Sequence, residues 1–266
     1  MKHVLTIAGS DCSGGAGIQA DLKTFATHGV YGMSVIVSVV AENTFRVIGV
    51  EDISPSMIAN QLDAVFEDIS VDAVKIGMLS TRSTMEAVAA KLDRFQPQNI
   101  VVDPVMVAKN GFALMSADVV DSLIALILPY ADILTPNIPE AEVLTGMHIE
   151  TLADMQESAE RIADLGPKAV LVKGGHRIED ATDLFYDGTT FFQFPAERID
   201  TKNTHGTGCT YSSAIAANLA RGMEPYDAIK AAKDYVTMAI RHSLSIGKGC
   251  GPTHHFYNLY KNGLAD

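Results

Sequence analysis

The chain has 266 residues, of which 47% are hydrophobic, and a formal net charge of −12 at pH 7. The length allows one large domain or two small ones, and because no linker, repeat or low-complexity run divides the chain, we expect a single domain over residues 1–266. The negative charge argues against nucleic acid and anionic membrane surfaces as partners. It still permits a phosphorylated ligand in a locally positive pocket.

The cysteines and the apolar runs indicate in which cellular compartment the protein is expected. Cys12, Cys209 and Cys250 are odd in number and widely spaced, which suits a reducing cytosol and argues against a disulfide framework or a structural zinc site. The apolar part of residues 1–8 is too short for a signal peptide, and the longest apolar stretch, residues 30–41, is too short to span a bilayer. We therefore expect a soluble cytoplasmic protein.

Strand and helix patterns alternate along the chain as far as residue 172. Apolar runs rich in β-branched residues predict buried strands at 3–8, 33–41, 73–76, 100–102, 133–135 and 169–172. Capping signals and amphipathic spacing predict helices at 18–28, 81–95, 116–128 and 151–166, with two more opening at Ser54-Pro55 and Asn137. This alternation predicts a parallel sheet with helices on both faces.

The pattern changes after residue 172. Segments 183–186 and 190–194 flank Asp187-Gly188, which is a strong hairpin signal. We expect this hairpin to add antiparallel strands at one edge of the sheet. Two helices, at 209–221 and 225–243, are predicted to follow.

Polar residues and glycines stand where several of these strands end. Ligands of parallel sheets bind beyond the carboxyl ends of the strands, so Gly9, Asp103, Asn137 and Lys173 should share one rim. Lys173 precedes two glycines and could neutralise a phosphate, although a lone lysine at a strand end is usually only solvated.

An anion site is predicted where the helix at 209–221 begins. Gly206-Thr207-Gly208 precede this helix, which should start at Gly208 or Cys209. Glycine lets the backbone approach a ligand closely, and a helix N-terminus offers free N–H groups and partial positive charge. A tight turn before a buried helix would use the same residues, and the stretch alone does not decide between the two readings.

Oxygen ligands on the rim suggest a magnesium ion. Asp103, Asn137 and Glu140 are hard oxygen donors of the kind that suits Mg²⁺, largely through water and substrate phosphates. The alternative is that Asn137 and Glu140 only cap the helix, since Asn at the cap with Glu three residues later is a capping-box pattern.

The thiol of Cys209 is expected to have a lowered pKa because it stands at a helix start. It could take a proton from a substrate hydroxyl or help to position an anion, whereas most free cysteines only pack. His254 and His255, near the C-terminus, could suggest a metal, but no third ligand has matching spacing, so we expect these two and His205 to be surface or packing histidines.

A different class of enzyme is suggested by Gly15-x-Gly17-x-x-Ala20, which formally matches the dinucleotide-binding fingerprint. Residues 10–14 separate it from the preceding strand, where the fingerprint should follow directly. With Glu42 as the ribose-binding acid, this reading would be a nicotinamide-dependent oxidoreductase. No Walker-type phosphate loop occurs.

Six stretches together resemble a known family. Residues 5–11, 14–24, 103–109, 135–137, 172–176 and 205–210 are similar in sequence and order to the bacterial hydroxymethylpyrimidine/phosphomethylpyrimidine kinases of thiamine biosynthesis, members of the ribokinase-like superfamily. The resemblance implies a three-layer α/β/α sandwich, often a homodimer. It also implies ATP–Mg²⁺-dependent phosphorylation of 4-amino-5-hydroxymethyl-2-methylpyrimidine and then of its monophosphate. Close relatives phosphorylate pyridoxine or pyridoxal, so that activity is the alternative.

The resemblance also implies roles for individual residues. The pyrimidine pocket would be lined by Gly9, Asp21, Glu42, Met78 and Val105. The implied ATP contacts are Asp103, Asn137 and Lys173, and the implied Mg²⁺ ligands are Asp103, Asn137 and Glu140. Gly206, Thr207 and Gly208 would form the anion hole around the transferred phosphoryl group.

Two positions bear on mechanism and substrate. Cys209 stands where the wider superfamily has an aspartate base, as it commonly does in this kinase branch. Glu42 stands where the branch usually has glutamine, which can both donate to and accept from an aminopyrimidine edge, whereas an ionised glutamate only accepts. A non-catalytic regulator that kept the pocket is a further alternative and would bind the pyrimidine without turnover.

Overall fold

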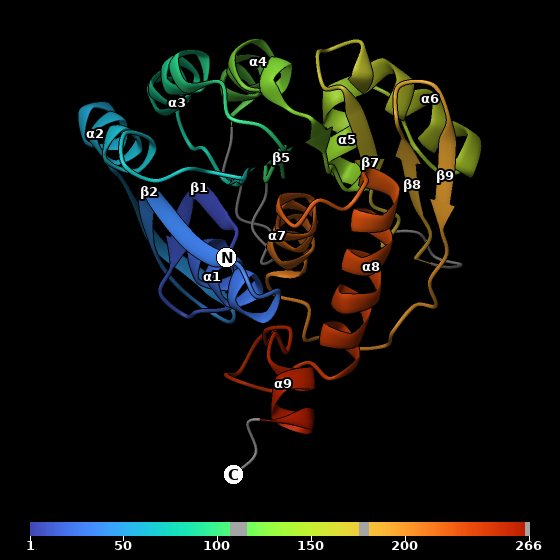
Figure 1. Ribbon diagram of the computed structural model, residues 1–266. Helices are drawn as coiled ribbons and strands as arrows, with labels where there is room; N and C mark the ends of the chain where they lie inside the picture. Colours follow the sequence, from blue (N-terminus) through green and yellow to red (C-terminus); the bar gives the residue numbers. More distant parts are fainter. Residues whose placement is uncertain (107–115, 176–180, 264–266) are drawn as a thin grey trace.

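The computed structural model describes residues 1–106, 116–175 and 181–263, and these contain a sheet of nine strands (Figure 1). Val107, Ala108, Lys109 and His176, which belong to the motifs quoted above, lie outside the described residues. The order across the sheet is β3-β2-β1-β4-β5-β6-β7-β8-β9. The strands are β1 His3–Asp11, β2 Tyr31–Asn43, β3 Arg46–Asp52, β4 Ala73–Ile76, β5 Ile100–Val102, β6 Ile133–Leu134, β7 Ala169–Val172, β8 Asp183–Tyr186 and β9 Phe191–Phe194.

The centre of the sheet is parallel and its two edges are antiparallel. β2, β1, β4, β5, β6 and β7 pair in parallel. β3 pairs antiparallel with β2 at one edge, and β8 and β9 form an antiparallel hairpin at the other. The predicted parallel sheet with an antiparallel edge hairpin is therefore confirmed.

Helices cover both faces of the sheet and complete the three layers (Figure 1). One face carries α1 Gly17–Thr27, α7 Thr207–Ala220 and α8 Pro225–Arg241, and the other carries α2 Pro55–Phe66, α3 Arg82–Phe95, α4 Ala117–Leu126, α5 Ile138–Thr145 and α6 Leu152–Ala163. A 3₁₀ turn, Leu128–Tyr130, follows α4, and α9 Tyr257–Asn262 comes last. Among the described residues, no helix combines the length and apolar character needed to cross a lipid bilayer.

A separate hydrophobic core lies on each face of the sheet. In β7, Leu171 packs into the core beneath α7 and α8, whereas its neighbours Val170 and Val172 pack into the core beneath the opposite helices. Successive strand residues point to opposite faces, so a strand covered on both sides needs an apolar residue at every position. This accounts for the unbroken apolar runs in the sequence.

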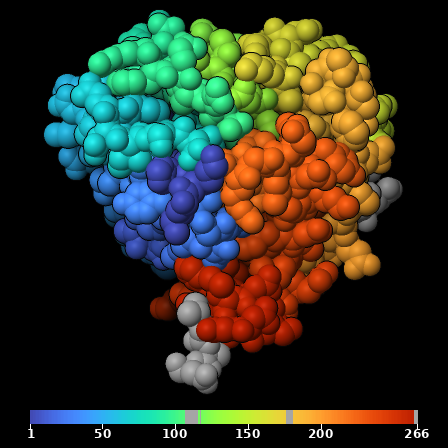
Figure 2. Space-filling model, viewed as in Figure 1, coloured from blue at the N-terminus to red at the C-terminus, as the bar shows by residue number. Residues whose placement is uncertain are grey.

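Segments far apart in sequence meet around α7. Ser213 of α7 donates a hydrogen bond to Asp21 of α1 at 2.7 Å, and Thr27 of α1 donates to the hydroxyl of Tyr235 in α8 at 3.0 Å. On the face shown in Figure 2, the blue N-terminal residues border the orange residues of the C-terminal helices. This packing brings the first turn of α7 to the loop that follows β1.

Four features differ from the sequence predictions. β1 continues past the predicted stop at Gly9 to Asp11, with a register shift against β2 between Ala8 and Gly9. β3 and α9 were not predicted. The residues of β3 are mostly exposed at the sheet edge and so lack the apolar pattern of a buried strand. α7 begins at Thr207, slightly earlier than predicted.

Candidate functional site

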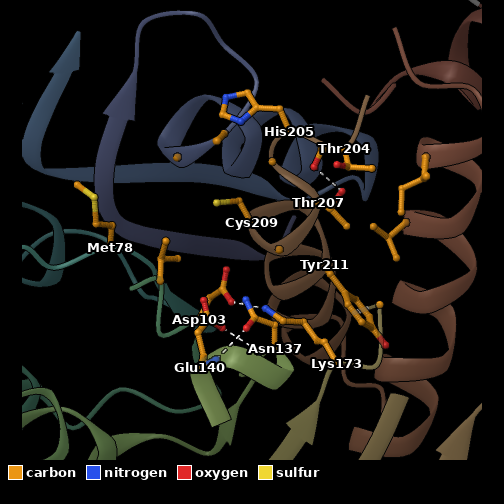
Figure 3. A pocket seen from close by; sticks show the side chains of 18 of the residues that line it. Met78, Asp103, Asn137, Glu140, Lys173, Thr204, His205, Thr207, Cys209 and Tyr211 are labelled. Carbon is orange, nitrogen blue, oxygen red and sulfur yellow. Dashed lines mark hydrogen bonds and ion pairs between the residues drawn. The ribbon is translucent and has the colours of Figure 1, made fainter. Parts of the chain in front are cut away.

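A cavity of about 830 Å³ lies at the carboxyl ends of the parallel strands, beside the N-terminus of α7 (Figure 3). The predicted rim and the predicted anion loop therefore meet in one place. The residues predicted from the sequence that line it are Gly9, Glu42, Met78, Asp103, Val105, Asn137, Glu140, Lys173, Gly206, Thr207, Gly208 and Cys209.

Asp21 does not line this cavity, contrary to the role that the resemblance implied. Its side chain in α1 is completely buried behind the wall. Its carboxylate accepts hydrogen bonds from Thr6 at 2.6 Å, Ser213 at 2.7 Å and Lys75 at 2.9 Å. These donors come from β1, α7 and β4, so Asp21 joins the elements that carry the site rather than contacting its contents.

The α7 end of the cavity holds a lysine and an aspartate in direct contact. The ammonium of Lys173 lies 2.6 Å from Oδ1 of Asp103, and Thr135 donates to the same oxygen at 3.3 Å. A Cβ on Gly208 would lie 3.1 Å from Oδ2 of Asp103 and 3.4 Å from Nζ of Lys173. Glycine at this position lets the helix start approach both charges closely.

Asn137 and Glu140 form the capping box that the sequence allowed as an alternative. The Asn137 side chain accepts from the Glu140 N–H at 2.9 Å, and the Glu140 carboxylate accepts from the Asn137 N–H at 2.8 Å. Burial raises the pKa of Glu140 to about 7, with Asp103 adding to the shift and Lys173 opposing it. Two buried carboxylates that repel each other beside a cavity form a donor set that fits a divalent cation.

The anion loop depends on glycine for its shape. Gly206 has a φ of +77°, in the left-handed region, and caps α7. A Cβ on Gly206 would overlap the carbonyl oxygen of Gly15, so the loop before α7 and the loop after β1 touch through their backbones. Gly206, Thr207 and Gly208, at the start of α7, line the cavity, so the helix N-terminus lies where an anion site requires it.

The pKa of Cys209 differs from the sequence prediction. Burial raises the pKa of this thiol to about 11, and the carboxylates of Asp21 and Asp103 add to the shift, while Lys75 and the N–H of Gly17 oppose it. The prediction of a lowered pKa was wrong because it considered the helix terminus alone. The enclosure of the sulfur and the two neighbouring aspartates appear only in the folded chain.

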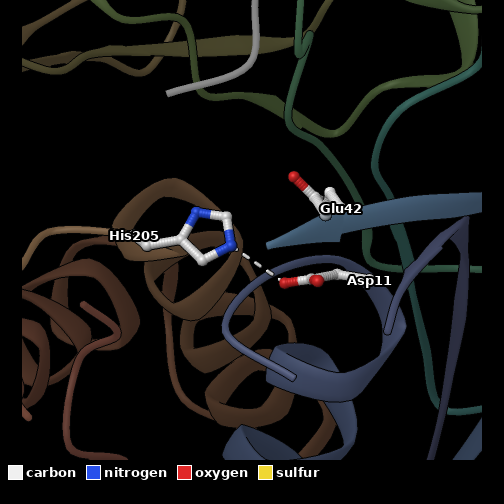
Figure 4. Close-up of side chains that lie close together, drawn as sticks. All are labelled: Asp11, Glu42 and His205. Carbon is white, nitrogen blue, oxygen red and sulfur yellow. Dashed lines mark hydrogen bonds and ion pairs between the residues drawn. The ribbon is translucent and has the colours of Figure 1, made fainter. Parts of the chain in front are cut away.

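His205 has a defined role that the sequence did not reveal. Its Nε2 lies 2.9 Å from Oδ2 of Asp11, and a carboxylate oxygen of Glu42 lies within 4.8 Å of ligand atoms of both residues (Figure 4). Asp11 also accepts from the backbone N–H groups of Ser13 at 2.7 Å, Gly15 at 2.9 Å and Ala16 at 2.8 Å. The pair thus fastens the loop after β1 to the residue that precedes the anion loop. The sequence signal that could have indicated part of this arrangement is Asp11 followed by small residues, a pattern typical of a turn in which the aspartate accepts from nearby backbone N–H groups.

The dinucleotide fingerprint serves packing in this chain. A Cβ on Gly15 would overlap the ring of His205, and one on Gly17 would overlap the carbonyl oxygen of Gly9. The glycines are therefore needed for contacts within the protein. The oxidoreductase interpretation loses the observation on which it rested.

Comparisons with known proteins agree with this geometry. A family model described as phosphomethylpyrimidine kinase matches residues 11–254. A hydroxymethylpyrimidine/phosphomethylpyrimidine kinase of Rhizobium meliloti (strain 1021) is 53% identical over 97% of this chain and 98% of its own length. The structure of phosphomethylpyrimidine kinase from Clostridium difficile 630 has a TM-score of 0.82 and 46% identity, covering 90% of this chain and 100% of that one. An ADP complex of Bacillus subtilis pyridoxal kinase has a TM-score of 0.90 and 43% identity, covering 96% and 98%.

The three layers, the cavity at the strand ends and the glycine anion loop before α7 define a small-molecule kinase of the ribokinase-like class. Within that class, the chain belongs to the phosphomethylpyrimidine kinase family.

Proposed function

We propose that the protein transfers the γ-phosphoryl group of ATP to the hydroxyl of 4-amino-5-hydroxymethyl-2-methylpyrimidine, and then phosphorylates the monophosphate, in thiamine biosynthesis. The observation that carries the proposal is the meeting of the anion loop, Cys209 and the Lys173–Asp103 pair in one cavity. Membership of the phosphomethylpyrimidine kinase family supports the choice of substrate.

The phosphoryl group would transfer at the start of α7. The backbone N–H groups of Gly206, Thr207 and Gly208 would hold the negative oxygens of the transferred group, and Lys173 would neutralise the ATP phosphates together with them. The substrate hydroxyl oxygen forms the new bond to phosphorus, the bond from phosphorus to ADP breaks, and the hydroxyl proton passes to the sulfur of Cys209. Cys209 in thiolate form would thus be the general base.

Asp103, Asn137 and Glu140 would hold a magnesium ion, with Asn137 and Glu140 also keeping their helix cap. When bound, Mg²⁺ neutralises charge on the ATP phosphates. The repulsion that raises the pKa of Glu140 supports this assignment, because a cation would relieve it. From the same position, Asn137 would also contact the ATP phosphates.

The pyrimidine ring would lie at the β1 end of the cavity, against Gly9, Met78 and Val105. A Cβ on Gly9 would come within 2.6 Å of Cε of Met78 and 2.9 Å of Oγ of Ser38, so glycine keeps this wall open for a flat ring. Glu42 would face the amino group. Burial raises the pKa of Glu42 to about 7, and Asp11 adds to the shift while His205 opposes it. A protonated Glu42 can donate and accept, as glutamine does.

The test is ADP release with ATP and Mg²⁺ in the presence of hydroxymethylpyrimidine, its monophosphate, pyridoxal or pyridoxine. Turnover of the first two compounds with little of the others is the expected result. Preference for the B6 vitamers would support pyridoxal kinase, the candidate favoured by the similarity to the Bacillus subtilis pyridoxal kinase. No turnover of any of the four would leave a non-catalytic binding protein.

We also propose that the chain works as one kinase domain in the cytoplasm and forms a homodimer. The free thiols of Cys12, Cys209 and Cys250 are compatible with a reducing compartment. Apolar side chains at the β2–β3 edge support the dimer, since Val39, Phe45, Ile48 and Val50 are all exposed there.

A further inference from the structure

Lys75 is a buried basic residue that the reaction described above does not use. It lies in β4, its side chain is completely buried, and it contributes to the same cavity wall as Cys209. The other residues of this strand, Ala73, Val74 and Ile76, are apolar. Burying a charge is costly unless it is paired, and an apolar side chain would normally be as stable here. The charge therefore calls for a functional explanation.

Asp21 fixes the position of the Lys75 ammonium. Nζ of Lys75 lies 2.9 Å from Oδ2 of Asp21, whose carboxylate also accepts from Thr6 and Ser213. The carboxylate is thus fully engaged and cannot turn away. The ammonium has three N–H groups, and among the described residues Asp21 is the acceptor found for it. Asp21 therefore holds Lys75 in place, and the other N–H groups of its ammonium can still interact with groups on the cavity side.

The ammonium lies at the carboxyl end of β4, close to the start of α7. A Cβ on Gly77 would be 2.7 Å from Nζ of Lys75 and 3.1 Å from Cβ of Ala8. The lysine side chain therefore runs along the strand toward Gly77, which leaves the room it needs. Its pKa is raised because the charges of Asp21, Cys209 and Asp103 outweigh the effect of burial, so it stays charged.

Charged groups on several elements act on the sulfur of Cys209. Burial raises the pKa of this thiol, Asp21 in α1 and Asp103 after β5 add to the rise, and Lys75 in β4 opposes it. Lys173, after β7, is a second cation that interacts with the sulfur, and its ammonium is bound to Asp103 at 2.6 Å. Among the described residues, Lys75 is the cation with the largest effect on the thiol.

We propose that Lys75, held in place by Asp21, supplies positive charge that stabilises the thiolate of Cys209. A cysteine can take the proton of a substrate hydroxyl only in its thiolate form. Lys75 acts through Cys209 and is therefore a positioning residue rather than a catalytic one. Its importance for turnover rests on the proposed function, but its effect on the thiol does not.

The proposal is tested by the rate at which iodoacetamide alkylates Cys209, in a chain that also carries Cys12→Ser and Cys250→Ser. At about pH 8 the thiol is mostly protonated, so the alkylation rate follows the thiolate fraction. Lys75→Met should slow alkylation about tenfold, which corresponds to one pKa unit. Asp21→Asn should accelerate it, because Lys75 then acts on the sulfur unopposed by that carboxylate.

The opposite changes in alkylation rate expected for Lys75→Met and Asp21→Asn distinguish an electrostatic effect on Cys209 from a loss of structure. If Lys75 and Asp21 only held the fold together, both changes would loosen the site and alter the rate in the same direction, which would overturn the proposal. Lys75→Met alone leaves the carboxylate of Asp21 buried without its cation, which could itself disturb the site. The alkylation rate of Asp21→Asn is therefore also compared with that of the double variant Asp21→Asn/Lys75→Met, in which neither charge remains. The double variant should react more slowly, and equal rates would likewise overturn the proposal.

Alkylation requires neither ATP nor pyrimidine, so the two proposals can fail separately. If the unmodified chain shows no kinase activity while the alkylation rates change as expected, the proposed function fails and the role of Lys75 stands. If the chain is an active kinase and the rates of Asp21→Asn and the double variant are equal, the function stands and the role of Lys75 is wrong.

Discussion

At the residue scale, Glu42 determines how substrate binding should depend on pH. Its pKa is raised to about 7, so it carries a proton below that pH and loses it above. The protonated form can bond to both the amino group and the ring nitrogen of an aminopyrimidine, whereas the ionised form repels the ring nitrogen's lone pair. We expect KM for hydroxymethylpyrimidine to rise about tenfold for each pH unit above the pKa.

Glu42→Gln provides the matched control, because glutamine has the same shape and the same donor and acceptor at every pH. KM of this variant should stay flat across the range in which the unmodified enzyme weakens. Since titration of the substrate or of ATP would affect both proteins equally, a parallel rise in KM would assign the pH dependence to the substrate and remove Glu42 from recognition.

Cys209→Ala tests the general base. Loss of a positioned base typically reduces turnover by about 10²–10⁴-fold, and we expect a fall in kcat of that order with nearly unchanged KM values. Cys250→Ala is the control, since Cys250 donates to the carbonyl of Lys202 at 2.9 Å and lies outside the cavity lining. The measurement is kcat and KM of the two variants by steady-state kinetics. Equal kcat values for both variants would show that Cys209 is a packing residue and not the general base.

The sequence identified the residues of the site better than their electrostatics. Position in the chain and family motifs were enough to bring Cys209 to the cavity, but its pKa depends on enclosure and on Asp21, 188 positions earlier in the numbering (209 − 21). His205 was interpreted as a packing residue because its partner, Asp11, lies 194 positions away. Charges that meet only through folding leave no local pattern.

At the element scale, the start of α7 should be far less tolerant of change than its end. Gly206 and Gly222 flank this helix, and both have positive φ values, of 77° and 88°. A Cβ on Gly222 meets no atom within 4 Å, whereas one on Gly206 overlaps the carbonyl of Gly15. Gly222→Ala should cost about 1–2 kcal/mol of unfolding free energy for the left-handed backbone alone.

Gly206→Ala should cost about 1–3 kcal/mol more than that, because the backbone must also move apart. The shift would displace the anion loop, so its turnover should fall while that of Gly222→Ala stays near normal. Urea unfolding and kinetic assays of both variants provide the measurement. Equal stabilities would mean that the two loops separate easily and that their contact does not fix the site.

The capping box before α5 allows the metal role of Glu140 to be isolated. Glutamine can replace glutamate in a capping box, so Glu140→Gln should keep the cap with Asn137 and change the melting temperature little. It removes one of the carboxylates proposed to hold Mg²⁺. We expect a higher Mg²⁺ concentration for half-maximal activity, and an unaltered Mg²⁺ titration would leave Glu140 with its capping role alone.

The elements that could be predicted are those whose burial leaves a periodic signal. β4, β5 and β7 were predicted at their observed bounds because they are apolar at almost every position. β3 was missed because an exposed edge strand needs no apolar pattern, and its residues Arg46–Asp52 are held by backbone pairing with β2. Tertiary pairing, which no local window contains, determines such a strand.

At the scale of the whole molecule, alternation of strands and helices was sufficient to predict the layers and the rim. The right-handed crossover rule and the burial of both sheet faces leave few arrangements for such a chain. The alternation could not predict the contact between Asp11, at the end of β1, and His205, in the last third of the chain. That contact joins the proposed pyrimidine end of the cavity to its phosphoryl end.

The proposed homodimer is tested at the sheet edge. Ile48 in β3 is 66% exposed and belongs to the apolar patch of Val39, Phe45, Ile48 and Val50 that the proposed interface would cover. Ile48→Lys should lower the molar mass measured by light scattering by about half, since a buried, unpaired lysine would oppose association. Met57→Lys, on the 52% exposed side chain of Met57 in α2, is the control and should leave the mass unchanged. A monomer in the unmodified protein, or a dimer that survives Ile48→Lys, would show that this edge is not the interface.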